Sequence, residues 1–141
     1  MKRITVLGIS LLAVAACAPQ AAPPPPEPIA AAPYAAGSAA NTTTAFDGNW
    51  GPVTVTHTSV GCSDVTYHRA HLTIQNGLAQ IHDPSLGGIR LQGYVTPQGA
   101  LTMQSNTGQS FEGQFNANNA LVGQARGPNC VWDVTWSSRV Y

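Results

Sequence analysis

The sequence predicts an all-β domain, a small antiparallel meander of about eight strands that closes into a barrel or a sandwich. Three observations predict it. From residue 46 onward, apolar residues occupy every second position of several short segments, which is typical of antiparallel strands with one covered face. Turn residues separate these segments. None of the segments has the period of an amphipathic helix, so we expect almost no helix in this part of the chain.

The candidate strands follow one another closely along the chain. Residues 53–58 begin with two valines that alternate with threonines. Leu72 and Ile74 alternate with a polar residue just before Asn76-Gly77, a pair that is typical of a hairpin turn. The same alternation returns in three later segments, at residues 89–95, 111–115 and 130–137.

A weak internal repeat supports a series of hairpins. Residues 91–101 and 111–121 share one pattern, in which two apolar residues flank a glycine and a leucine follows six residues later. Gly93, Gly113 and Gly123 then fall inside strands, where glycine is typical of a bend or of a close approach between backbones.

The tryptophans are expected in the core. Trp132 and Trp136 share the face of Cys130 in the last candidate strand, and large aromatic side chains supply much of the apolar area of a small core. Trp50, beside Gly48 and Gly51 at the start of the domain, is expected to close one end of a barrel.

Residues 1–16 have the pattern of a secretory signal peptide. Lys2 and Arg3 precede a short apolar stretch that ends in small residues. The stretch is too short to cross a bilayer comfortably, because a spanning helix needs about 20 residues. Residues 14–17, Val-Ala-Ala-Cys, resemble the lipobox of bacterial lipoproteins, in which one aliphatic and two small residues precede a cysteine.

The resemblance to bacterial lipoproteins covers this segment alone, and it implies that the chain is cut before Cys17 and that this cysteine carries lipid, palmitate included. Several acyl chains hold a protein stably on a membrane, since each buried methylene contributes about 0.8 kcal/mol. Residue 18 is alanine rather than aspartate. For this family that residue implies a lipid-anchored location at the cell outer membrane, facing the periplasm.

Residues 17–45 are expected to form the lipidated cysteine and a disordered Pro/Ala-rich tether. The run Pro23 to Pro26 fixes the backbone and removes hydrogen-bond donors. Proline-rich chain is extended, at about 3.1 Å per residue, so such a tether could reach roughly 85 Å. The β-domain is expected at residues 46–141, where aromatic residues and alternation begin.

The cysteine count fits this interpretation. Three cysteines are an odd number for an exported chain. If Cys17 carries lipid, Cys62 and Cys130 remain as a pair, and their disulfide would join the first and last parts of the meander. The chain-entropy model gives such a long loop on the order of 4 kcal/mol of stabilisation. Metal binding by the thiolates is disfavoured, because no Cys-x-x-Cys pair is present.

The charge balance excludes one class of partner. Charged residues make up 9% of the chain, and the formal net charge is zero. After Cys17, four arginines stand against six carboxylates. A nucleic-acid-binding protein would normally show a basic face, so no nucleic-acid partner is expected.

The sequence contains no recognisable catalytic motif. His68 and His71 are three residues apart, which on a strand places them on opposite faces. A metal site would need His57 or His82 to converge with an aspartate such as Asp83. Neither a nucleophile motif nor a phosphate-binding glycine loop is present. We therefore expect no enzyme activity, no metal and no cofactor.

The preferred function is that of a lipid-anchored envelope protein whose non-catalytic β-domain binds a protein or a cell-wall partner such as peptidoglycan. The candidate contact residues are Tyr67, Arg90 and Tyr94, which we expect on outward faces.

Two alternatives stay open. Gly48-x-Trp50 followed by Cys62 is similar to the start of the small bacterial inhibitors of secreted metalloproteases, which implies a proteinase-inhibitor barrel. In that family the disulfide closes a short loop, and no inhibitory residue can be carried over. The third function is a carrier of a small apolar ligand, although a barrel of this length is narrow enough for side chains to fill.

Overall fold

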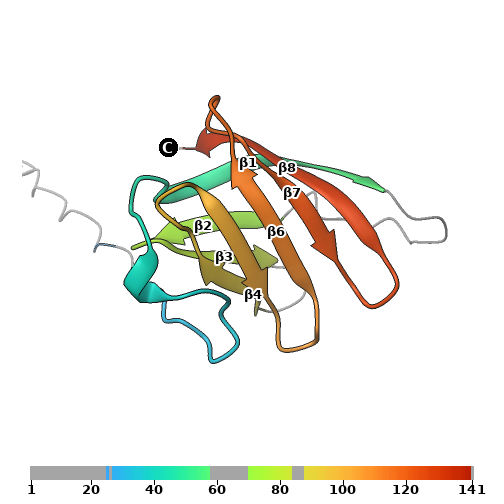
Figure 1. The fold of residues 1–141 in the computed structure, drawn as a ribbon, viewed down its shortest axis with the longest axis horizontal. Coiled ribbons are helices and arrows are strands. Elements are labelled where there is room, and N and C mark those ends of the chain that lie inside the picture. The colour runs from blue at the N-terminus through green and yellow to red at the C-terminus, as the bar shows by residue number, and fades with distance from the viewer. Residues whose placement is uncertain (1–24, 26, 58–69, 84–87, 141) are drawn as a thin grey trace, which may run out of the picture.

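The computed structural model describes residues 25, 27–57, 70–83 and 88–140. In this part of the chain, eight antiparallel strands form one closed barrel (Figure 1), in which each strand pairs with the next and β8 pairs with β1. The predicted all-β meander is confirmed, and the closure is a barrel. The strands are β1 (Gly48–His57), β2 (His71–Gln75), β3 (Leu78–Asp83), β4 (Gly88–Tyr94), β5 (Ala100–Gln104), β6 (Ser110–Phe115), β7 (Leu121–Arg126) and β8 (Val131–Val140).

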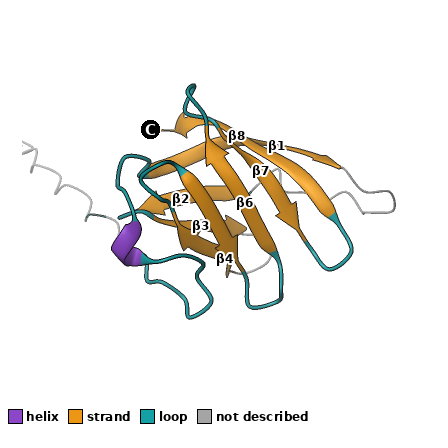
Figure 2. Ribbon diagram, viewed as in Figure 1, coloured by secondary structure: helices purple, strands orange, loops and turns teal. Residues whose placement is uncertain are grey.

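Helix is almost absent from the described residues. The single helical element there is one 3₁₀ turn, η1 (Ala39–Asn41), which precedes β1 and lies outside the barrel (Figure 2). No helix in the described ranges is long and apolar enough to cross a bilayer.

The hairpin between β2 and β3 forms at the predicted turn. Asn76 and Gly77 have φ values of 52° and 72°, and Gln75 pairs with Leu78 across the turn. A two-residue turn with positive φ at both central positions matches the right-handed twist of the strands that it joins.

The barrel closes through a long pairing of β1 with β8. The register runs from Asn49 opposite Val140 to His57 opposite Trp132. The pairing of β1 with β2 is much shorter and involves only Gly48, Asn49 and Trp50 of β1. The second half of β1 therefore rests mainly on β8, while Val53 and Val55 pack against the core.

Alternate residues of each strand fill the interior. Trp132 and Trp136 are 8% and 2% exposed, so both lie in the core as the alternation predicts. Trp136 meets Phe111 edge-on, with ring centroids 5.3 Å apart. The void among the apolar side chains here is about 10 Å³, roughly the space of one water molecule. It is lined by Ile81, Leu91, Phe111, Ala125, Val134 and Trp136.

Aromatic rings close one end of the barrel. Phe46 stacks on Phe115 at 4.2 Å between ring centroids, and Trp50 tilts against the same Phe115 ring at 4.7 Å. The Trp50 indole donates a hydrogen bond to the Phe46 carbonyl over 3.0 Å. The expectation that Trp50 closes an end of the barrel is thus met, and the Arg139 guanidinium covers its outer side at 5.3 Å from the ring centroid.

Candidate binding surface

The chain immediately before the barrel is docked on the barrel. We call residues 27–45 the strap; in Figure 1 it runs in blue and cyan along the β4 side. The sequence predicts a disordered tether up to residue 45, whereas these residues make hydrogen bonds to β2 and β4. The difference arises because the outward side chains of the two strands bind main-chain groups of the strap, which its non-proline residues supply whatever their side chains are.

Two outward-facing glutamines form the centre of this surface. Gln80 lies on β3 opposite Gln92 on β4, and the Gln92 amide donates to the Gln80 side-chain oxygen over 3.3 Å. Their neighbours Ile81 and Leu91 point inward to the core, so both glutamines point outward. Gln92 is nevertheless 0% exposed and Gln80 9% exposed. An outward position that is this deeply buried must be covered from outside, and the strap covers it.

Gln92 binds the strap backbone at two residues. Its side-chain nitrogen donates to the Ala30 carbonyl over 3.1 Å, and its side-chain oxygen accepts from the Ala32 N–H. Gln75 of β2 also binds the strap backbone, at the residue before Ala30. Its side-chain oxygen accepts from the Ile29 N–H over 2.8 Å. These contacts involve main-chain atoms of the strap and none of its side chains.

The strap then pairs with the edge of β4. Ala36 forms a parallel bridge with Gly93. The Ala36 N–H donates to the main-chain oxygen of Gln92 over 3.2 Å, and its carbonyl accepts from the Tyr94 N–H over 2.9 Å. A turn between Ala32 and Ala35 precedes this bridge, and Pro33 within that turn suits its fixed backbone angle.

The end of the strap is bound to the residue that follows β4. The Thr43 N–H donates to the Val95 carbonyl over 3.2 Å, and the Thr42 hydroxyl donates to the same carbonyl over 2.9 Å. Two residues beyond the strap, the Asp47 carboxylate accepts from the N–H groups of Asn76 and Gly77, over 2.8 and 2.9 Å. One carboxylate thereby holds the start of β1 to the β2–β3 turn.

A cleft with a mixed polar and apolar lining lies between the start of the strap and the neighbouring strands. Its volume is about 420 Å³, and it is lined by Glu27, Ile29, Asp47, Gly48, Asn49, Thr73, Ile74 and Gln75. The Thr73 hydroxyl donates to the Asn49 side-chain oxygen over 2.9 Å. The carboxylate, amide and hydroxyl groups along the cleft are suited to hydrogen bonding with a polar ligand or peptide.

The docking of the strap is weak compared with the packing of the barrel. No residue of the strap is fully buried, so it contributes little apolar burial. Each of its hydrogen bonds stabilises by about 0.5–1.5 kcal/mol, and fixing each residue's backbone costs about 1–2 kcal/mol. With these terms nearly equal, the first part of the strap opens at a lower free energy than the barrel.

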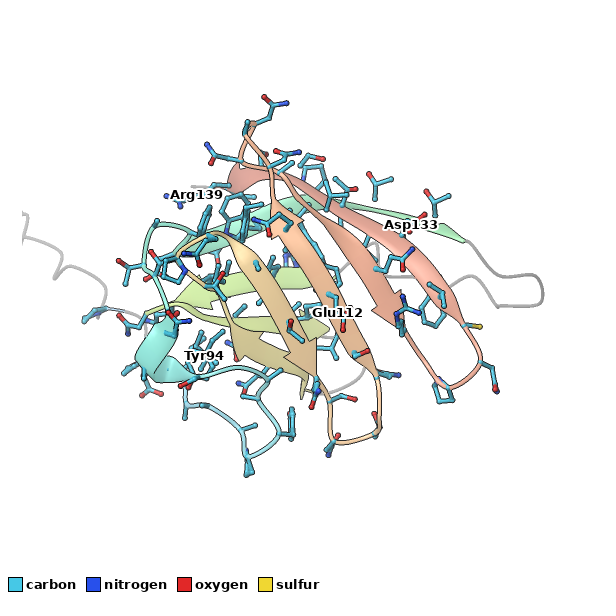
Figure 3. All side chains as sticks on the ribbon, in the orientation of Figure 1. Tyr94, Glu112, Asp133 and Arg139 are labelled. Carbon is cyan, nitrogen blue, oxygen red and sulfur yellow. The ribbon has the colours of Figure 1, made fainter. Side chains whose placement is uncertain are left out.

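The outer face of β6, β7 and β8 carries a separate polar row. Gln124 of β7 donates to the Asp133 carboxylate of β8 over 3.0 Å, and Arg126 donates to Gln124 over 3.0 Å. Glu112 of β6 lies opposite Gln124 in the register. Figure 3 places Glu112 and Asp133 on these strands and Tyr94 on the strap side of the barrel.

The sequence-predicted contact residues are placed only in part. Tyr94 is half-buried at the end of β4 and bonds to the strap through its main chain. Arg90 lies on the same strand, but its side chain lies outside what the structure describes, as does the whole of Tyr67. Sequence analysis missed Gln75, Gln80 and Gln92, because an outward glutamine on a strand carries no signal that another segment will cover it.

The predicted sulfur chemistry also falls mostly outside the described residues. Cys130, directly before β8, is disulfide-bonded. Cys17 and Cys62 both lie outside the described residues, so lipidation of Cys17 and the pairing of Cys62 with Cys130 stay predictions.

The histidines form no evident site in the part of the chain that the structure describes. There, His71 of β2 pairs in register with His82 of β3, and no three His, Cys, Asp or Glu side chains come together in a group that could hold a metal ion. His68 lies outside the described residues.

Comparison with known protein families, with curated proteins and with solved structures gives no match for this chain.

Proposed function

We propose that this chain is a lipid-anchored protein of the cell envelope whose β-barrel is non-catalytic and binds a protein or cell-wall partner on its outer surface. The observation that carries the proposal is the covered face of β2, β3 and β4. There, the fully buried Gln92 side chain binds main-chain groups of the strap. A surface that binds a segment of polypeptide in this way has the chemistry that partner binding requires.

Among the described core residues, the packing supports an outer rather than an inner binding surface. The void beside Trp136 and Phe111 holds about 10 Å³, whereas a site for a drug-sized ligand takes about 300 Å³ or more. This observation disfavours the carrier of a small apolar ligand. Nothing among the described contacts favours the proteinase inhibitor. Trp50, part of the motif that resembles the inhibitor family, is only 2% exposed and so offers no surface to a protease. Protection of a secreted metalloprotease by the purified chain would favour that alternative.

The lipid anchor is tested by replacing Cys17 with Ser and fractionating the cells. We expect the variant to be released into soluble fractions or to remain unprocessed, because the acyl chains supply the membrane affinity. Cys62→Ser is the matched control and should remain on the membrane. Normal cleavage and full membrane retention of Cys17→Ser would refute the anchor.

Partner binding is tested by site-specific photocrosslinking in intact cells. A photoreactive amino acid is placed in turn at Tyr94, beside the strap, and at Gln124, on the β7 outer face. We expect a discrete adduct with an envelope protein or with cell-wall fragments from at least one position. The absence of adducts from both positions would count against the proposed function.

A further inference from the structure

The strap-covered face has the chemistry of a peptide-binding site. Gln75 and Gln92 direct side-chain amides to three main-chain groups, those of Ile29, Ala30 and Ala32. The edge of β4 adds two main-chain bonds at Ala36. Main-chain pairing of a peptide with a strand, supported by side-chain contacts at neighbouring positions, is a general mode of peptide recognition.

The contacts define a short main-chain recognition pattern. Gln92 accepts from one residue of the strap and donates to the carbonyl two residues earlier. One side-chain amide can make both bonds because it carries a donor and an acceptor. The residues at these points are alanines, so the site accepts small side chains and binds the backbone between them.

The present occupant covers the site but gains little burial of its own. Gln92 and Gln80 are 0% and 9% exposed, yet no residue of the strap itself is fully buried. If the strap leaves, the two glutamine amides meet water, which hydrogen-bonds to them equally well. A partner segment that makes the same main-chain bonds therefore competes with the strap and displaces it when it is present in excess.

We propose that the outer face of β2, β3 and β4 binds an alanine- and proline-rich segment of a partner protein, and that the strap occupies this site until such a segment displaces it. The inference rests on the proposed function and narrows the partner to a protein that presents such a segment. Gln75 and Gln92 are the specificity-determining residues of the site.

The probe is a labelled synthetic peptide with the sequence of residues 27–37, blocked at both ends and titrated onto the full mature chain with Cys17→Ser. In the variant Ala32→Pro/Ala36→Pro, two N–H groups that donate to Gln92 are lost, so the strap is expected to leave the site. We expect the peptide to bind this vacated chain at least tenfold more tightly than the chain with its native strap. Equal affinity for both would overturn the inference.

The contribution of Gln92 to peptide binding is tested in the same chain with Ala32→Pro/Ala36→Pro. Gln92→Met keeps the length of the side chain and removes its hydrogen bonds, and should weaken peptide binding at least tenfold. Gln124→Met on β7 is the matched control, because it makes the same change on an outer face without the strap. An equal loss from both variants would contradict a site at Gln92.

A measurement on the native chain tests the same site without relying on the folding of variants. In NMR titrations with excess peptide, we expect shifts of the side-chain amide signals of Gln75, Gln80 and Gln92, with Gln124 unchanged. Shifts confined to Gln124 and its neighbours would overturn the inference.

Photocrosslinking separates the inference from the proposed function. A partner-protein adduct from Tyr94 that increases when the strap is vacated supports the inference. Adducts from Gln124 alone overturn it and leave partner binding intact. Adducts at twice the mass of the chain would identify a second copy as the occupant and overturn the assignment to a distinct partner.

Discussion

Gly93 of β4 and Thr102 of β5 lie in direct backbone contact. A Cβ atom on residue 93 would lie 1.7 Å from the Thr102 carbonyl oxygen and 2.9 Å from the Met103 Cα. The two strands share one register pair, Gln92 with Gln104. At this corner of the barrel, β5 therefore passes over the position that any side chain at residue 93 would occupy.

Replacing Gly93 with Ala should destabilise the barrel by about 3 kcal/mol, because the added methyl group overlaps a main chain that cannot rotate away. The midpoint of chemical denaturation measures the loss. Gly108→Ala is the control: Gly108 has a φ of +80° but no heavy atom within 4 Å of its would-be Cβ. That variant should cost about 1–2 kcal/mol, from backbone strain alone. A Gly93 variant no less stable than the Gly108 variant would contradict the contact.

The predicted position of Gly93 shows how far sequence alone reaches in the barrel. The alternation at residues 89–95 placed Leu91 and Val95 on one face of the strand, and both are buried, because a strand alternates its faces whatever its neighbours are. The glycine indicated that something would approach closely. Which atom approaches depends on how β5 crosses β4, a property of barrel closure that no local pattern contains.

Arg139 should contribute to stability although it lies on the surface. Its guanidinium donates to the Ala45 carbonyl over 2.8 Å and lies over the Trp50 ring. Arg139→Ala is therefore expected to cost about 1–2 kcal/mol in unfolding free energy. It should also change the tryptophan fluorescence of the folded state. Arg126→Ala, which loses one exposed bond to Gln124, should cost less than about 0.5 kcal/mol. Equal effects of the two substitutions would argue against the role of Arg139.

The strap marks the limit of what the sequence could predict for the candidate site. Proline and alanine carry no periodic apolar pattern, so residues 27–45 predict a free tether. The first part of the strap is bound through its backbone, and its partners Gln75 and Gln92 follow Ile29 and Ala32 by 46 and 60 residues. Main-chain contacts of this kind require no particular residue type in the strap, so no sequence pattern reveals them.

Asp47 should fix the start of β1 to the β2–β3 turn. Its two oxygens accept from the N–H groups of Asn76 and Gly77, so Asp47→Ala leaves both donors without this partner. We expect a loss of about 1–2 kcal/mol in unfolding free energy, together with faster hydrogen exchange at the two amides. Asp133→Ala removes one exposed bond to Gln124 and should cost no more than about 0.5 kcal/mol. Unchanged exchange at Asn76 and Gly77 would show that the carboxylate does not hold the turn in solution.

The last prediction concerns the disulfide of Cys130. Joined to Cys62, it would close a long loop containing β2 to β7, and it would restrict the unfolded chain by about 4 kcal/mol in the chain-entropy model. Domains of this size are stable by about 5–15 kcal/mol, so Cys130→Ser should lower the melting temperature markedly under oxidising conditions. A reductant should lower the melting temperature of the native chain to nearly the same value and should leave that of the variant unchanged. Peptide mapping by mass spectrometry would identify the partner, and a free, alkylated Cys62 in the native protein would exclude this pairing.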